Sequence, residues 1–227
     1  MSTERAALSA EDYESLLPLV TAERLGSYSR ATDGGTAAAF ALYEWNMRAA
    51  ASVMELTSMV EVIARNALDT QLRSWATRKH GHPSWLDVVP VDQQGRKDIQ
   101  HARDRATHRG RRPEVHGRVI AELSLGFWRY LVESRYLTSL WVPSTHAAFA
   151  HGHPDLRTRQ RDVASRMQQL NFVRNRAAHH EPIHQRDLRR DLGLALDLAQ
   201  WISPTAGEWV ENTTSLPAVL AERPSFS

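Results

Sequence analysis

The stretch AAAFALYEWNMRAAASVMELTSMVEVIARNALDTQLRS, residues 37–74, decides the fold that we expect for this chain. Its apolar residues recur at spacings of three and four, which places them along one face of a helix. The turn and cap signal Asp33-Gly34-Gly35-Thr36 precedes it. The sequence therefore predicts a long amphipathic helix here, whether continuous, kinked or split. The residues of its apolar stripe are Leu42, Trp45, Ala49, Val53, Leu56, Val60, Ile63 and Ala67.

Shorter segments with the same spacing follow along the chain. A polar helix is expected over about residues 95–108, ending near Gly110 and Pro113. The next expected helix carries Ile120, Leu123, Phe127 and Leu131 as its apolar residues.

Two further helices are expected in the last third of the chain. Asp155 can cap the first of them, and Pro182 should stop it, because a residue before proline resists the α conformation. The second runs over about residues 185–201 and ends at Pro204, with a short helical tail after it. Apolar residues of the first helix are Val163, Met167, Leu170, Val173 and Ala177.

Neither a repeat nor a sustained strand alternation stands out in the sequence. We therefore predict an all-α fold, a bundle of long helices in a single domain. Its expected parts are an N-terminal helical arm (1–35), a helical core (36–203) and a C-terminal tail (204–227). Phe127 and Trp128 lie in an apolar stripe, so we interpret them as core residues, with base stacking as the alternative.

Composition limits the classes of function. The chain has no cysteine, which excludes disulfides and thiolate zinc sites. No signal peptide or membrane span is recognisable, so we expect a soluble, cytoplasmic protein without membrane partners. Nearly all the positive charge is arginine, and it gathers in residues 96–118 and 157–190. Guanidinium groups suit phosphate, so both segments favour polyanionic partners.

The candidate chemical centre is Arg174-Asn175-Arg176-Ala177-Ala178-His179-His180. Asn175 and His179 are four residues apart and therefore share a helix face, and the long side chain of Arg174 can curl towards them. Histidine transfers protons near neutral pH, and arginine holds phosphate and offsets charge in a transition state. This combination suits RNA cleavage by the RNA's own 2′-hydroxyl, without a metal or cofactor. The alternative is a chance pairing in a chain rich in arginine and histidine.

The sequence Arg-Asn-Arg-Ala-Ala-His-His-Glu-Pro-Ile at 174–183 resembles the signature of the Abi-like (abortive infection) family of the HEPN superfamily. Blocks at 43–46, 61–68 and 122–128 resemble those of the same family, in the same order, so the resemblance covers roughly residues 20–222. Leu125 departs from it, since phenylalanine is more frequent there.

This resemblance implies a HEPN-type helical bundle with the motif on a late helix. It also implies metal-independent endoribonuclease activity that leaves cyclic phosphate ends, as in toxins and phage defence. A symmetric homodimer would join two motifs into one composite site. Arg174, Asn175 and His179 match the catalytic positions, and Arg176 fills the variable position after Asn175.

Several other residues are candidates for RNA binding or for support of the motif. Glu61 and Arg65 could form an exposed ion pair of little weight, or could line the groove beside the motif together with Asn66, which the resemblance favours. His180 is expected to end the helix or to contact RNA. A metal site with His184 is disfavoured, because Pro182 separates the two histidines, so we expect no metal.

Two other classes of function stay open at this point. The basic groove could bind RNA, such as a structured noncoding RNA, without cutting it. The bundle could also serve as a protein-interaction scaffold for an antitoxin or another component of a defence system.

Overall fold

The computed structural model describes residues 8–33 and 35–226, and within these residues every regular element is a helix. Residues 1–7 of the expected N-terminal arm and Gly34 of the expected cap signal lie outside them. The all-α prediction is confirmed. No helix in the described part is long and apolar enough to cross a membrane.

The element order along the chain begins with two short helices and one very long one. The helices are α1 (Ala10–Val20), α2 (Ala22–Thr32), α3 (Gly35–His80), α4 (Gln93–Ala106), α5 (His116–Glu122), α6 (Leu125–Leu131), α7 (Leu156–Ala178), α8 (Leu188–Ile202), α9 (Pro204–Thr213) and α10 (Leu216–Ala221). Shorter turns of helix are η1 (Trp85–Asp87), η2 (Ser134–Tyr136), η3 (Leu137–Trp141) and η4 (Thr145–Phe149).

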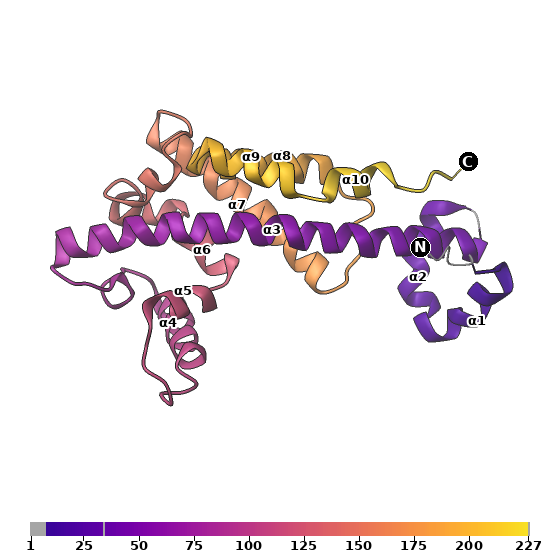
Figure 1. The fold of residues 1–227 in the computed structure, drawn as a ribbon, viewed down its shortest axis with the longest axis horizontal. Helices are drawn as coiled ribbons and strands as arrows, with labels where there is room; N and C mark the ends of the chain where they lie inside the picture. The colour runs from indigo at the N-terminus through magenta and orange to yellow at the C-terminus, as the bar shows by residue number, and fades with distance from the viewer. Residues whose placement is uncertain (1–7, 34, 227) are drawn as a thin grey trace, which may run out of the picture.

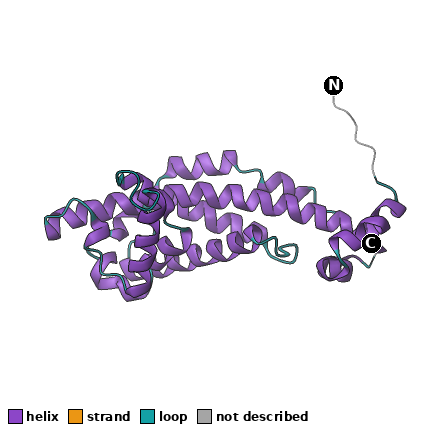
Figure 2. Ribbon diagram, turned by 90° about the horizontal axis from the view of Figure 1, so that it is seen from below, coloured by secondary structure: helices purple, strands orange, loops and turns teal. Residues whose placement is uncertain are grey.

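Helix α3 is the axis of the molecule. Its 46 residues form one uninterrupted helix, about 69 Å long at 1.5 Å per residue. The helix predicted over residues 37–74 is therefore continuous rather than split, and it is longer than predicted at both ends. Helices α8, α9 and α10 run along one side of α3, whereas α4 and α5 project from the opposite side (Figure 1). Helices α1 and α2 fold against its first turns. The body is elongated (Figure 2).

Large aromatic side chains fill the core around α3. Trp45, Trp85, Trp128 and Trp141 are fully buried, and Trp85, Phe127 and Trp128 contact one another through their rings. The interpretation of Phe127 and Trp128 as core residues is therefore confirmed. Trp209 is exposed, so burial does not extend to every tryptophan.

One predicted helix is divided in the structure. The segment carrying Ile120, Leu123, Phe127 and Leu131 forms α5 and α6 instead of one helix. The break falls at Ser124, whose Oγ accepts a hydrogen bond from the Phe127 amide (3.4 Å) and so starts a new helix. Apolar spacing does not reveal such a break, because Ile120 and Leu123 before it and Phe127 and Leu131 after it are all buried.

Proline and aspartate place the later helix ends. Asp155 Oδ1 accepts from the Thr158 amide (2.8 Å) and starts α7, as predicted. Asp187 Oδ1 accepts from the Arg190 amide (2.9 Å) and starts α8. This helix therefore begins at Leu188, three residues later than the predicted start at 185. Pro204 ends α8 but also opens α9, since proline is favoured in a first helical turn.

Candidate functional site

Helix α7 carries the motif and crosses α3. Its apolar residues Val163, Met167, Leu170 and Val173 are buried, and it packs against α3, α6 and α8. The loop after α7 lies on the same side of α3 as α4 and α5 (Figure 1). The motif therefore occupies the C-terminal end of a helix whose remaining turns belong to the core.

The motif residues surround the last turn of α7. Arg174 is half-buried, and its Nη1 donates to Oδ1 of the exposed Asn175 (3.3 Å). The helix ends at Ala178, and His179 is its C-cap, with a backbone N–H that donates to the Asn175 carbonyl (3.0 Å). The His179 side chain is exposed and makes no hydrogen bond to the described part of the chain. Imidazole, amide and guanidinium thus meet solvent at one helix end.

The loop that follows is tied to distant parts of the chain. His180 adopts a positive φ of 56°, and its carbonyl accepts from the guanidinium of Arg24 in α2. The amide of the buried Ile183 donates to Oδ1 of the buried Asn46 in α3 (2.8 Å). These two bonds fix the chain immediately after His179. The loop leaves the helix in a left-handed conformation that non-glycine residues rarely adopt.

Arg176 belongs to this loop rather than to the open face of the motif. Its Nη2 donates to the Pro182 carbonyl (2.7 Å), and Nη1 pairs with Glu181 at 3.1 Å. The guanidinium also lies 5.7 Å from the ring centroid of Phe172. These contacts give Arg176 a supporting role and commit its donors to the protein.

Glu61 of α3 lies beside the motif. Burial raises the pKa of its carboxyl, while the charges of Arg174 and Arg65 and the backbone amide of Leu125 oppose that rise. The structure therefore brings Glu61 close to Arg174 and to the start of α6. Glu61 and Arg65 form no ion pair within 4.0 Å in the described chain, so the simple surface pair is not what the structure contains.

Arg65 and Asn66 occupy different surroundings. Arg65 is half-buried, and its Nε is inaccessible and lacks a hydrogen-bond partner among the described residues. Asn66 is exposed, five residues from Glu61, and so points about 140° away from it around α3. Of the three α3 residues expected to line the groove, Glu61 lies near Arg174 and is also within reach of the charge of Arg65, whereas Asn66 points away.

Several contributors were not found from the sequence. Arg24 and Asn46 line a pocket of about 320 Å³ together with Ala178 and His180. Asn171 lies one turn before Asn175, and its Oδ1 would be 3.6 Å from a Cβ added at Gly126. The sequence could have indicated Asn171, because it lies four residues before Asn175 and so shares its helix face. No local pattern in the sequence indicates that Arg24 or Asn46 lies near the motif.

His184 is separated from the other motif histidines. It is buried against Tyr28, with ring centroids 4.7 Å apart, and its Nε2 lies 3.3 Å from Ser27 Oγ. Burial and the charge of Arg223 lower its pKa. In the described residues, no three His, Cys, Asp or Glu side chains form a group that could hold a metal ion.

Comparison with known proteins gave one uniform result. No protein-family model, no curated protein and no solved structure matches the chain.

Proposed function

We propose that this protein is a metal-independent endoribonuclease of phage-defence or toxin type, with the HEPN-type architecture that its motif resembles. The observation that carries the proposal is that the half-buried Arg174 and the exposed Asn175 and His179 occupy the same end of α7. Arg174 would hold the scissile phosphate, His179 would transfer a proton, and Asn175 would position the guanidinium, which already donates to its amide oxygen.

The reaction needs no nucleophile from the protein. The 2′-oxygen of the RNA bonds to phosphorus as its proton leaves to a base, and the bond from phosphorus to the 5′-oxygen breaks as that oxygen gains a proton. The products are a cyclic phosphate and a hydroxyl end. The guanidinium of Arg174 offsets the negative charge that grows on the phosphate oxygens in the transition state.

The two proton transfers favour two copies of the chain. One imidazole at a time serves as base or as acid, and the ring of His179 is the exposed imidazole on the face of Asn175. A homodimer with a two-fold axis beside this face would supply the second ring. Exposed apolar side chains near the motif offer contact area for such a dimer: Met47 and Val62 on α3 and Phe172 on α7.

Cleavage of labelled RNA in the presence of a chelator tests the proposal. His179→Ala should lower the rate by about 10²–10⁴-fold, the range for loss of a general acid or base. His151→Ala is the matched control, because this exposed histidine lies before the opposite end of α7 and uses only its backbone amide. Equal cleavage by the wild type and His179→Ala would reject the proposal.

A binding experiment with the same variants separates cleavage from recognition. If both proteins bind RNA with steep salt dependence and neither cuts it under any condition, the chain is an RNA-binding module. If neither binds RNA, the scaffold alternative gains, and the proposed activity is wrong.

A further inference from the structure

The chain between α4 and α5 forms a rigid turn that projects from the molecule. His108, Arg109 and Gly110 have φ values of 50°, 57° and 80°. Such a conformation costs non-glycine residues about 1–3 kcal/mol each and persists only where the surroundings impose it. Thr107 imposes it here, because its Oγ1 accepts from the Gly110 amide (3.0 Å) and its carbonyl accepts from the Arg112 amide (2.9 Å).

The lobe that carries this turn, which we define as α4, the turn and α5 (residues 93–122), is anchored on α3. Asp69 of α3 accepts hydrogen bonds from Trp85 Nε1 (2.6 Å) and lies 2.7 Å from His116 Nε2 at the start of α5. Trp85 is buried, so these contacts hold the chain on both sides of α4. The turn is therefore presented at a fixed place, as a folded element rather than a loose loop.

Positive charge is concentrated in this lobe beyond anything the overall composition requires. Residues 101–118 contain six arginines and two carboxylates, a formal charge of +4, whereas the whole chain carries +2. The remainder of the chain is therefore net negative. The lobe therefore attracts anions, whereas the rest of the chain as a whole, with its net negative charge, does not.

The arginines of the lobe divide into two groups. Arg103 pairs with Asp87 and Glu114, and Arg105 pairs with Glu122, so these two hold the lobe together. Four others are exposed and have no ion pair or side-chain hydrogen bond in the described chain: Arg109, Arg111, Arg112 and Arg118. Their donors point at solvent.

A hollow accompanies these exposed arginines. It has a volume of about 560 Å³ and is lined by His101, Asp104, Arg105, His108, Arg109 and Arg111. Asp104 is its one carboxylate, and it accepts from Gln100 Nε2 (2.9 Å). The volume lies within the range of ordinary ligand sites, about 300–1,000 Å³.

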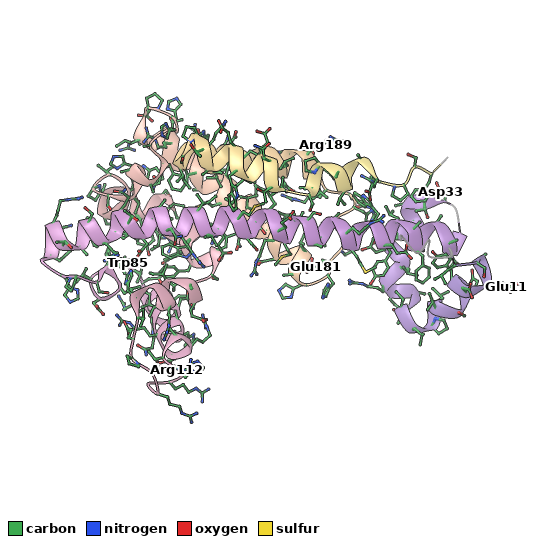
Figure 3. The ribbon with its side chains drawn as sticks, viewed as in Figure 1. Glu11, Asp33, Trp85, Arg112, Glu181 and Arg189 are labelled. Carbon is green, nitrogen blue, oxygen red and sulfur yellow. The ribbon has the colours of Figure 1, made fainter. Side chains whose placement is uncertain are left out.

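The lobe and the loop after the motif lie on the same side of α3. Arg112 at the tip of the lobe and Glu181 beside the motif both lie on one side of α3, while Arg189 lies on the opposite side (Figure 3). A strand bound at the motif therefore has the exposed arginines of the lobe on its own side of α3.

We propose that the turn at 108–112, together with Arg118 on α5, binds the sugar–phosphate backbone of RNA at a distance from the cleavage point. This inference deepens the proposed function and names the surface that holds the substrate. Guanidinium forks match phosphate oxygens, and contacts of this kind position a strand without reading its sequence. The lobe contributes to affinity, and the end of α7 contributes the chemistry.

The test compares two paired substitutions in protein that carries His179→Ala, with a labelled single-stranded RNA of mixed sequence as the probe. Arg111→Gln/Arg112→Gln removes two exposed charges next to the turn and leaves its positive-φ residues intact. Arg189→Gln/Arg190→Gln removes two exposed charges from α8, which runs along the other side of α3. Both variants have the same net charge, so any difference in their RNA affinity comes from where the charges were removed.

Salt titration gives the expected result. Each single-strand phosphate contact adds about 0.7 to the slope of log affinity against log salt, so two contacts add about 1.4. Between about 50 and 200 mM salt, the parent should therefore lose about sevenfold more affinity than the lobe variant. The control should follow the parent. Equal slopes for the two variants, or no RNA binding by the parent, would overturn the inference.

Steady-state cleavage with His179 restored separates this inference from the proposed function. In the active protein, the lobe substitutions should raise KM and spare kcat, and the control should change neither. A lobe-dependent slope in a protein that never cleaves RNA would leave this inference standing and reject the nuclease. Cleavage that the lobe substitutions leave unchanged would support the nuclease and reject this inference.

Discussion

The two arginine-rich segments of this chain use their guanidinium groups in different ways. Of the nine arginines in residues 157–190, four are held by contacts that serve the fold, Arg174 donates to the neighbouring amide, and Arg161 pairs with the adjacent Asp162. The other three, Arg157, Arg189 and Arg190, are exposed without an ion pair in the described chain. In residues 96–118, two arginines brace the lobe through ion pairs, Arg96 donates to the Val91 carbonyl, and the other four face solvent. The braced arginines of the later segment are Arg159 on the His153 carbonyl, Arg166 on Asp197, Arg176 on Glu181 and Arg186 on Asp191.

This contrast teaches that arginine content alone does not locate a binding surface. A guanidinium held by a carboxylate has no net charge to offer a phosphate, whereas an unpaired one keeps both its charge and its donors. The end of α7 carries one half-buried guanidinium and one exposed imidazole. The lobe keeps several exposed guanidinium groups and no similar constellation. We therefore expect substitutions at α7 to change the rate of cleavage, and substitutions in the lobe to change affinity.

Among the substitutions that test this comparison of arginines, the largest expected effect comes from Arg174. Arg174→Ala should lower kcat by about 10²–10³-fold, the usual cost of removing one donor to a transition-state oxyanion. Arg174→Lys should recover only a small part, because an ammonium lacks the planar fork. The measurement is single-turnover cleavage of labelled RNA.

The lobe should tolerate the same change. Arg112→Lys keeps the charge, so RNA affinity should fall by about twofold or less, since a backbone contact is mainly electrostatic. If lysine is equally tolerated at Arg174, the difference in role between the two regions is wrong.

A smaller effect is expected from the bond that anchors the motif loop. Asn46→Ala removes the acceptor of the buried Ile183 amide, and leaving a buried donor unpaired costs about 1–3 kcal/mol of the free energy of unfolding. Cleavage should fall as well, because the loop after His179 loses its tie to α3. Urea unfolding monitored by circular dichroism measures the stability.

Thr107→Val is the corresponding change in the lobe. It removes the acceptor for the Gly110 amide, which lies at an exposed turn where water can replace it. The expected loss is about 1 kcal/mol or less, without a change in kcat. A greater loss for Thr107→Val than for Asn46→Ala would contradict the view that the motif loop is the more tightly anchored of the two.

The smallest expected effect concerns the carboxylate beside the motif. Burial raises the pKa of Glu61 above 4.5, its ordinary value, so the folded state favours the protonated form. Its stabilising contribution is therefore present below pH 4.5 and is lost as the pH rises through the folded pKa. At neutral pH, Glu61→Gln should be more stable than the wild type by less than about 1 kcal/mol, because solvent screens a half-exposed group.

The pH dependence supplies the check. The advantage of Glu61→Gln should shrink as the pH falls towards 4 in thermal unfolding experiments. Glu211→Gln, at an exposed position on α9 without an ion pair in the described chain, should show no such trend. A stability difference that grows with acidity would show that Glu61 pairs with Arg174 more strongly than burial penalises it.

Much of the fold was predictable because its signals are local. The apolar stripe of α3, the Asp155 cap of α7 and the stop near Pro182 follow from residues within a few turns of one another. The break at Ser124 was missed, although Ser is a good cap, because apolar spacing continues across it. An apolar pattern reports which side is buried and is insensitive to one interrupted hydrogen bond.

The candidate site was predictable only in part, for the same reason. Asn175 and His179 share a helix face by spacing alone. Arg24, Asn46 and Glu61 reach the motif from more than one hundred residues away in the sequence, and no local pattern records that approach. Asn66, which the sequence grouped with Glu61, faces elsewhere because five helical residues separate them.

The sequence by itself determined that the chain is helical and where its long helices lie. It also determined that Asn175 and His179, with arginines beside them, lie at the end of one of these helices. These properties depend on periods and caps that span a single helix. Tertiary structure alone decided which arginines are neutralised and which face solvent, and that the lobe and the loop after the motif share one side of α3. Charge pairing and orientation depend on contacts between distant segments, and only the packed chain defines those contacts.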